Sequence, residues 1–217
     1  MLLFGLTFRC LSGGFISSSS LKSLPLIYLN SRSPRRARLL EQMDIRFIKV
    51  DCLISEEIKS GEKARDYVIR MSKEKAIAGL QTKGLTLGAD TIVVLKGSVI
   101  GKPCNIGEAR ETLAKLSGQE HFVLTAVSAY DGKKLNSVMV ESRVKIKNLS
   151  KYEIDSYCAT GEPLDKAGSY GIQGVGGVFV ESMSGSYSGI VGLPIKQTEE
   201  LLLSFDIDTW KDRAIRR

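Results

Sequence analysis

Apolar residues along this chain fall into short continuous runs and into stripes at helical spacing. Short runs rich in β-branched residues predict strands over residues 26–29, 45–50, 91–95, 98–100, 122–130, 135–146, 178–183 and 187–191. Helical spacing or capping residues predict helices over residues 34–40, 62–80, 109–116, 150–159 and 194–203. The last two strands suggest a hairpin around Ser184 and Gly185, and the charged tail after Asp206 is expected to be loosely ordered. No internal repeat or clear linker interrupts the chain.

The stretch from Leu87 to Pro103 organises the chain, because two apolar runs flank Lys96 and Gly97 as in a hairpin. Asp90 stands where the first strand begins. A carboxylate there is costly to bury unless a cation or hydrogen-bond donors meet it, and Lys102 is the nearest candidate. The alternative is a strand-end residue that ties down a turn.

The register of this hairpin decides whether Asp90 and Lys102 share a face, since side chains alternate along a strand. A two-residue loop at 96–97 places Thr91 opposite Lys102 and turns Asp90 to the other face. A three-residue loop that adds Ser98 makes Lys102 a diagonal neighbour of Asp90. The second register is predicted.

The segment from Ser31 to Arg36 is a candidate phosphate cradle. Ser33 and Pro34 suit the N-cap and the first position of a helix, so a helix begins there. Arg35 and Arg36 then lie in its first turn, where cations oppose the helix dipole unless an anion is held there. Two solvated arginines on a surface helix are the alternative.

Three further places carry candidate chemistry. Lys75 falls on the apolar stripe of its predicted helix, where it either snorkels to the edge or projects into a cleft toward an anion. Glu56 and Glu57 form an acidic pair in a loop, which is weak local support for a metal ligand. Gln173 lies within residues 162–177, which are rich in glycine. So many glycines imply positive backbone dihedrals or a close approach of the backbone to another group, for example a ligand. A mobile loop with an exposed glutamine is the alternative.

Composition describes an ordinary globular protein of 217 residues, 43% hydrophobic and 25% charged, which is enough for one medium domain with a real core. The four cysteines form no Cys-x-x-Cys pair and His121 is the single histidine. A zinc site, a disulfide framework and a histidine-dependent hydrolase triad are therefore not indicated, and His121 is interpreted as structural. The net charge of +7 favours an anionic partner, either nucleic acid or a phosphorylated small molecule. No apolar run approaches the length of a membrane span.

The two ends differ from the rest of the chain. Residues 1–24 contain no acidic residue, two basic residues and a serine run. They are either an organelle transit segment or an extension upstream of the true start. Residues 25–205 form the predicted domain, and residues 206–217 form a basic tail.

The motifs collected so far match, in order and spacing, the Maf family of nucleoside triphosphate pyrophosphatases, which this chain resembles from about residue 26 to residue 203. The matching motifs are Ser31-Arg32-Ser33-Pro34-Arg35-Arg36, Lys75-Ala76, Gly88-Ala89-Asp90-Thr91, Gly101-Lys102-Pro103, Leu116-Ser117-Gly118, Thr125-Ala126-Val127, Glu162-Pro163-Leu164-Asp165-Lys166-Ala167-Gly168, Gly171-Ile172-Gln173-Gly174 and Val191-Gly192-Leu193-Pro194. Each is modest alone, but together they are highly specific. Asn30, Arg38 and the spacing of residues 51–57 depart from the family pattern.

The resemblance implies a two-lobed α/β fold like that of the inosine triphosphatases, with an elongated mixed sheet flanked by helices and a nucleotide cleft between the lobes. It also implies hydrolysis of a nucleoside triphosphate to the monophosphate and pyrophosphate, with a divalent metal cation, Mg²⁺ or Mn²⁺. Asp90 corresponds to the catalytic carboxylate and proton acceptor, and it would bind the metal together with Glu56, for which Glu57 is the substitute. The substrate-binding residues it implies are the phosphate ligands Arg36, Lys75 and Lys102 and, beside them, Ser31, Arg35, Thr91 and Gln173.

Within the family, Thr91, Gln173 and Arg35 resemble the branch that acts on dTTP and UTP. These nucleotides and modified pyrimidine nucleotides are therefore the expected substrates, and the expected role is removal of non-standard pyrimidine nucleotides. The same chemistry on another base, such as 7-methyl-GTP, is the nearer alternative, and a basic nucleic-acid-binding module is a remote one. Neither nucleic acid nor a membrane is therefore expected as a partner, while a homodimer is a family expectation. The expected location is the cytoplasm, or an organelle if residues 1–24 are a transit segment.

Overall fold

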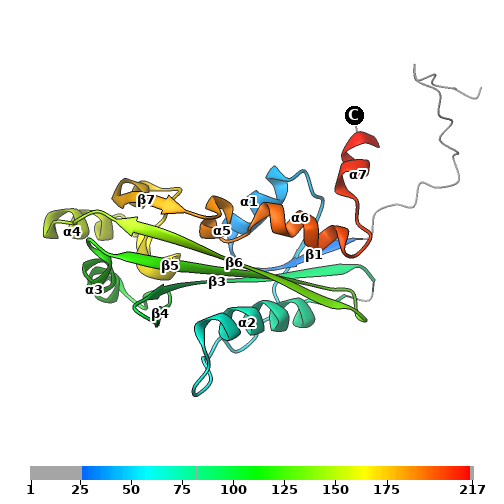
Figure 1. Cartoon of the computed structure of the whole chain (residues 1–217), viewed down its shortest axis with the longest axis horizontal. Helices are drawn as coiled ribbons and strands as arrows, with labels where there is room; N and C mark the ends of the chain where they lie inside the picture. Colours follow the sequence, from blue (N-terminus) through cyan, green and yellow to red (C-terminus); the bar gives the residue numbers. More distant parts are fainter. Residues whose placement is uncertain (1–25, 82, 216–217) are drawn as a thin grey trace, which may run out of the picture.

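The chain folds around one mixed β-sheet with helices on both faces (Figure 1). The structure is a computed structural model that describes residues 26–81 and 83–215, so the segment 1–24 lies outside the described residues. The strands are β1 (Ile27–Asn30), β2 (Ile48–Val50), β3 (Leu85–Leu95), β4 (Ser98–Ile100), β5 (Glu120–Tyr130), β6 (Leu135–Ile146) and β7 (Val180–Ser184). Their order is β2-β1-β3-β5-β6-β7, with β4 paired to β3; β1 is parallel to β2 and β3, and the other pairs are antiparallel.

The helices complete an α/β arrangement that confirms the predicted fold class. They are α1 (Pro34–Gln42), α2 (Ala64–Ala78), α3 (Ile106–Leu116), α4 (Lys151–Ala159), α5 (Tyr187–Val191), α6 (Ile195–Leu203) and α7 (Thr209–Ile215), with short 3-10 turns at Glu162–Asp165, Ala167–Ser169 and Val175–Phe179. Ser33 stands at the N-cap of α1 with Pro34 behind it, as predicted. Ser150 and Glu153 form the predicted capping box of α4.

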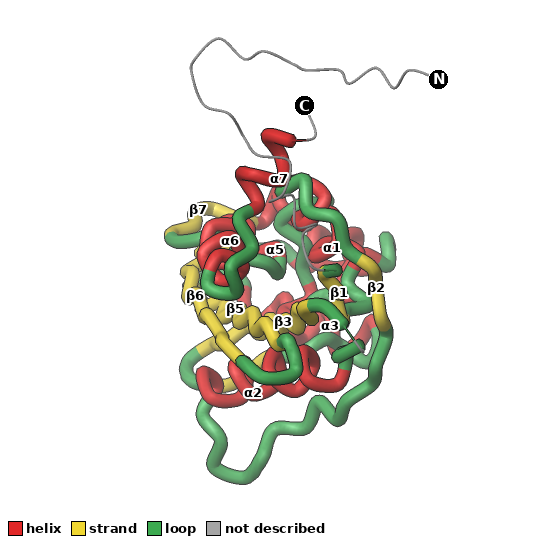
Figure 2. The backbone as a smooth tube through the Cα atoms, turned by 90° about the vertical axis from the view of Figure 1, so that its right-hand side faces the viewer, coloured by secondary structure: helices red, strands yellow, loops and turns green. Residues whose placement is uncertain are grey.

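Side-chain alternation along β3 assigns its residues to two differently packed faces. On one face, Ile92 and Val94 belong to an apolar cluster beneath α2. On the other face, Leu87 belongs to a cluster beneath α1 and α6, and Val93 belongs to a second cluster against α3 and α4. Thr91 lies between these two clusters. Each cluster forms the core of one lobe of the domain. Figure 2 shows α2 on one side of the strands and α1, α5 and α6 on the other.

The predicted register of the β3–β4 hairpin is wrong. Leu95 pairs with Ser98, so the loop contains only residues 96–97. Both loop residues have positive φ, +49° and +83°, as the tight turn favoured between twisted antiparallel strands requires. If this register continued beyond β4, Lys102 would lie opposite Thr91 and would not share a face with Asp90. However, β4 ends at Ile100, so the alternation of side chains along a strand does not fix the direction of Lys102.

Two predictions about the C-terminal part are also wrong. The run from Tyr187 to Val191 forms α5 instead of a strand, because Ser186 caps it by accepting a hydrogen bond from the backbone N–H of Gly189. Short apolar runs of this length do not distinguish a strand from a helix. The tail after Asp206 is not loose over its described part, since it forms α7, in which Arg213 makes an ion pair with Glu199 of α6.

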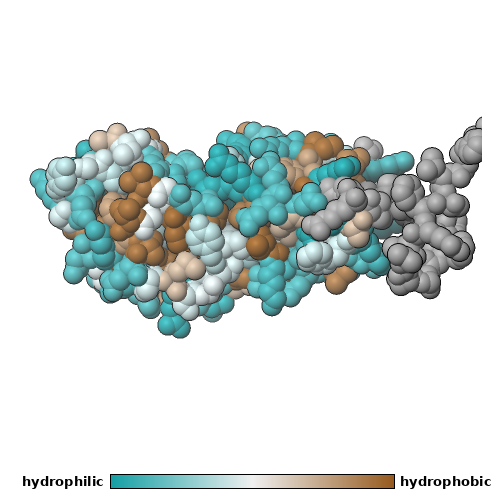
Figure 3. Space-filling model, turned by 90° about the horizontal axis from the view of Figure 1, so that it is seen from above, coloured by the Kyte–Doolittle hydropathy of each residue, from teal (hydrophilic) through white to brown (hydrophobic). Residues whose placement is uncertain are grey.

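Hydrophilic side chains cover most of the face seen from above, with smaller apolar patches between them (Figure 3). The exposed large apolar residues include Val178 and Met183, next to and within the edge strand β7. No helix in the described part of the chain has the length and apolar character of a membrane span.

Gly88 sets the distance between β3 and α2. A Cβ built on Gly88 would lie 2.2 Å from the backbone N of Ala76 and 2.4 Å from the backbone O of Ser72. Both are helix backbone atoms that cannot rotate away. The close contact places the last turn of α2, which carries Lys75, directly over β3 two residues before Asp90.

We predict that Gly88→Ala lowers the free energy of unfolding by about 3 kcal/mol, because the added methyl forces α2 off the sheet. Denaturant unfolding measures this loss. Gly101→Ala is the matched control, since its Cβ would meet no atom within 4 Å and its φ is not positive, and its cost should stay below about 0.5 kcal/mol. Equal stability of the two variants would contradict this account of the contact.

Candidate active site

The candidate site lies where one edge of β3 lacks a neighbouring strand. On this edge β1 pairs with residues 85–88 and β4 pairs with residues 93–95, while β5 occupies the other edge. Residues 89–92 thus have no strand partner on this edge within the described part of the chain. Asp90 and Thr91 point to opposite faces of the sheet, and the gap lets both line one cavity of about 300 Å³.

The cavity collects charged and polar side chains from both faces and both lobes. Those that line it are Ser33, Arg35, Arg36, Glu56, Tyr67, Lys75, Asp90, Thr91, Lys102, Lys166 and Gln173. A second, more polar cavity of about 70 Å³ shares Arg36, Glu56, Lys75 and Lys102 with the first and adds Ser31. Every residue predicted for the site lines one of these two cavities, except Glu57, the substitute for Glu56.

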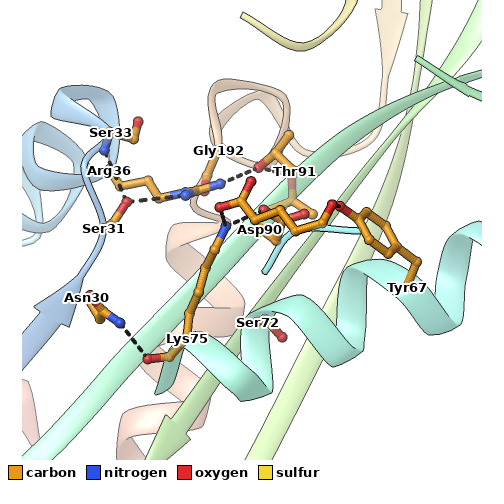
Figure 4. A network of polar contacts seen from close by, with 12 residues as sticks. Asn30, Ser31, Ser33, Arg36, Tyr67, Ser72, Lys75, Asp90, Thr91 and Gly192 are labelled. Carbon is orange, nitrogen blue, oxygen red and sulfur yellow. Dashed lines mark hydrogen bonds and ion pairs between the residues drawn. The ribbon is translucent and has the colours of Figure 1, made fainter. Parts of the chain in front are cut away.

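Lys75 connects the two predicted metal ligands, Asp90 and Glu56, and Figure 4 shows its contact with Asp90. Its Nζ donates to Asp90 Oδ1 at 2.7 Å and lies 2.8 Å from Glu56 Oε1. The Lys75 side chain is only 12% exposed and the Asp90 side chain 10%, so the ammonium projects into the cleft and does not snorkel to the surface. One cation thus bridges two carboxylates that come from β3 and from the loop before α2.

The surroundings of Glu56 favour its charged form. Burial raises the pKa of this carboxyl, but the hydrogen bond and charge of Lys75, with the charges of Lys102 and Arg36, outweigh burial and lower it. Tyr67 donates its hydroxyl to the backbone carbonyl of Glu56 at 2.9 Å. Burial, together with the negative charges of Asp90 and Glu56, raises the pKa of Tyr67 to about 12, so the phenol keeps its proton at neutral pH.

Arg36 is fixed by three hydrogen bonds on the opposite face of the sheet (Figure 4). Its guanidinium donates to Gly192 O at 2.9 Å, to Thr91 Oγ1 at 3.1 Å and to Ser31 Oγ at 3.2 Å. The Thr125 hydroxyl lies 3.0 Å from Thr91 Oγ1 and donates to a backbone carbonyl of α5. Burial lowers the pKa of Arg36, although the charge of Asp90 opposes this effect.

Lys102 provides the third cation of the candidate phosphate set. Burial lowers the pKa of its ammonium, the charge of Glu56 acts against that, and the charges of Arg36 and Lys75 add to the lowering. Three cations that destabilise one another in a partly buried space favour an anion among them.

Arg35 links the two lobes across the cleft. Its guanidinium forms an ion pair with Asp165 at 2.6 Å, and Lys166 contacts another oxygen of the same carboxylate at 2.6 Å. Burial raises the pKa of Asp165, but these two cations lower it further than burial raises it. Lys166 itself lines the cavity opposite α1.

The glycine-rich segment closes tightly around Glu162. This carboxylate accepts hydrogen bonds from the backbone N–H groups of Val175 and Gly176 and from the Tyr157 hydroxyl. A Cβ on Gly174 would come within 2.3 Å of the Glu162 carboxylate, so the close approach expected there is to the chain itself. Gln173, in the same turn, remains exposed at the cavity.

Sequence reasoning missed some of the residues that shape the site. Tyr67 and Lys166 both line the cavity, although no motif or local pattern predicts a role for either of them. Of the acidic pair, Glu56 lines the cavity, whereas Glu57 does not, although its backbone carbonyl binds Arg70. His121 lies apart: it is buried, it hydrogen-bonds the Tyr170 hydroxyl at 2.8 Å, and burial lowers its pKa to about 4, which fits a structural role.

We predict that Lys75→Met raises the pKa of Glu56, because the variant keeps the burial and loses the ammonium. A depressed folded pKa contributes stability that is present above the ordinary value of 4.5 and is lost as the pH falls through the folded value. The variant should therefore lose less stability than the native protein below pH 4.5. Carboxyl NMR titration measures the pKa directly. Lys73→Met, on the same helix, is the control, and an unchanged Glu56 pKa in Lys75→Met would count against the contact.

Comparisons with known proteins place the chain in a family. The family model described as Maf-like protein matches residues 26–205. A dTTP/UTP pyrophosphatase of Pseudoalteromonas atlantica is 46% identical over 183 residues, covering 82% of this chain and 95% of that protein. One from Escherichia coli O157:H7 is 48% identical, covering 83% and 93%.

Two solved structures are also similar. A HAM1 protein from Coxiella burnetii has a TM-score of 0.43 at 15% identity, covering 82% of this chain and 98% of that one. The Staphylococcus aureus Ham1 protein has a TM-score of 0.39 at 13% identity, covering 56% and 71%. The family match and the identity to the two pyrophosphatases, over more than four-fifths of the chain, decide the assignment. The chain belongs to the family of Maf-like proteins.

Proposed function

We propose that this protein hydrolyses dTTP, UTP and modified pyrimidine nucleotides to the nucleoside monophosphate and pyrophosphate, and that its action on the modified nucleotides removes them before polymerases use them. The observation that carries the proposal is that three cations, Lys75, Lys102 and Arg36, line one cavity together with Asp90, and that Lys75 pairs with the Asp90 carboxylate. The names of the two pyrophosphatases that share 46% and 48% of their aligned residues with this chain support the same reaction. A cytoplasmic location and a homodimer are parts of the proposal that rest on the family resemblance.

In this proposal Asp90 is the general base. Lys75 holds Oδ1 of Asp90, which leaves Oδ2 to accept the proton of a water molecule. That water attacks the α-phosphorus, and the bond from the α-phosphorus to the bridging oxygen of the β-phosphate breaks. Pyrophosphate leaves with the electron pair of this bond. Lys75, Lys102 and Arg36 neutralise the charge that grows on it, which is the main electrostatic contribution in phosphoryl transfer.

The acidic residues fit a divalent cation that arrives with the substrate. The described residues contain no group of three or more His, Cys, Asp and Glu side chains placed to hold a metal ion. Asp90 and Glu56 offer two carboxylates around the Lys75 ammonium. Mg²⁺ is commonly bound by one or two carboxylates together with water and substrate phosphates, and oxygen ligands also suit Mn²⁺. When bound, the ion would screen the phosphates and polarise a phosphoryl oxygen.

In this proposal Gln173, at the exposed edge of the cavity, selects the base. The carboxamide of Gln173 can donate to and accept from a base edge, and it lies exposed at the cavity. Thr91 and Arg35 contribute indirectly in this arrangement, since Thr91 binds Arg36 and Arg35 binds Asp165. Ser31 accepts a hydrogen bond from Arg36 and thereby supports the phosphate side.

The catalytic role of Asp90 predicts that Asp90→Asn lowers the rate of pyrophosphate release about 10²–10⁴-fold, because the amide cannot accept the proton. The assay measures pyrophosphate from a panel of nucleoside triphosphates with Mg²⁺, and dTTP and UTP should react best. Asp66→Asn, an exposed residue of α2, is the control that keeps the native rate. Equal rates for Asp90→Asn and the native protein, or no pyrophosphate from any triphosphate, would refute the proposal.

The role of Gln173 predicts a separate change in selectivity. Gln173→Glu replaces the amide donor by an acceptor, so kcat/KM for dTTP and UTP should fall about tenfold relative to other bases, while turnover persists. Gln42→Glu, exposed at the end of α1, adds the same charge far along its helix and serves as control. An unchanged order of preference across the nucleotide panel would remove Gln173 from base recognition.

A further inference from the structure

Asn30 is a buried polar residue that the proposed reaction leaves without a role. It ends β1, where it pairs with Val50 of β2 and Gly88 of β3, and it is 3% exposed. Its side-chain amide donates to Lys75 O at 2.9 Å and to Cys52 O at 3.1 Å, and its Oδ1 accepts from Cys52 N at 2.9 Å. Both N–H donors and the carbonyl are therefore bound to backbone groups.

These backbone groups belong to the two segments that supply Glu56 and Lys75. Cys52 lies at the start of the long irregular loop that leads from β2 to α2, visible in Figure 2, and Glu56 is four residues further along this loop. Lys75 O lies in the last turn of α2, where it accepts a hydrogen bond from Asn30 (Figure 4) and another from the N–H of Gly79. A Cβ on Gly79 would come within 2.6 Å of Asn30 Cβ, so glycine permits this close approach.

Among the described residues, the other attachments of the loop are the packing of Ile54 against the apolar cluster beneath α2, an exposed ion pair between Asp51 and Arg32, and hydrogen bonds from α2. Tyr67 donates to Glu56 O, and Arg70 donates to Glu57 O, so the side chains of α2 hold the later part of the loop. Asn30 holds its beginning and joins it to the helix turn that carries Lys75. The 2.8 Å contact between the Lys75 ammonium and Glu56 depends on this spacing, because the two residues come from separate segments.

We propose that Asn30 is a positioning residue for the proposed reaction: it aligns Glu56 with Lys75 by clamping the start of the acidic loop to the end of α2. Asn30 lines the smaller cavity, but its amide N–H groups and its Oδ1 already bind Cys52 and Lys75, so its role is to position these segments and not to bind the substrate. The inference rests on the proposed function, because the alignment of Glu56 affects catalysis only if Glu56 helps to bind the metal and the triphosphate. A carboxamide that merely satisfied buried backbone groups would affect stability alone.

A double-mutant cycle tests this proposal, with Asn30→Ala and Glu56→Gln alone and combined. If Asn30 acts through Glu56, Asn30→Ala should lower kcat about tenfold in the native background and less than about twofold in the Glu56→Gln background. Ser72→Ala is the matched control: Ser72 is also buried, lies on α2 one turn before Lys75 and hydrogen-bonds Ser128, but does not contact the loop. It should change stability without changing kcat.

Amide hydrogen exchange of the free protein provides a second measurement that does not depend on turnover. Asn30→Ala should accelerate exchange of the Cys52 N–H at least tenfold, because Oδ1 of Asn30 is its acceptor, while Ser72→Ala should not. Equal kcat losses in both backgrounds, or unchanged exchange at Cys52, would overturn the role of Asn30. Absence of pyrophosphate release from the native protein would instead contradict the proposed function itself.

Discussion

The Lys75 ammonium between Asp90 and Glu56 is the interaction on which the site depends. Two carboxylates that face one partly buried space repel each other and favour protonation unless a cation lies between them. At 2.7 and 2.8 Å, Lys75 satisfies both and keeps Glu56 ionised. The free protein is thus already organised for a charged ligand.

This ion pair requires an unusual combination of close packing and an open sheet edge. Gly88 lets the backbone of α2 approach β3, which brings Lys75 over Asp90. The unpaired edge at residues 89–92 then gives one cavity access to both faces of β3. A fully paired strand would have placed Asp90 and Thr91 on opposite sides of a closed sheet. The interruption between β1 and β4 is therefore a structural condition for the site.

The two lobes contribute differently to the cavity. The lobe beneath α1 and α6 supplies Arg36, which the backbone of Gly192 and the hydroxyls of Thr91 and Ser31 fix in place. The other lobe supplies a glycine-rich turn that Glu162 fixes by accepting hydrogen bonds from its backbone amides. Its glycines allow the chain to fold onto Glu162, and this leaves Gln173 at the rim. The lobes meet where polar threonines interrupt the apolar clusters of the sheet.

The sequence alone determined the sheet-and-helix character, most element positions and the chemical types in the site. These follow from local information: β-branched runs, the Ser33-Pro34 helix start, the capping box at Ser150 and the order of the motifs that resemble one family. The register of the β3–β4 hairpin and the fold of residues 187–191 could not be obtained in this way. The first depends on turn geometry, and the second is a short apolar run whose conformation is set by its cap and its neighbours. Only the tertiary structure decided that Glu56 and not Glu57 meets Lys75, and that Asn30 holds their two segments together, because these contacts join residues 19 to 45 positions apart through backbone packing that no local pattern encodes.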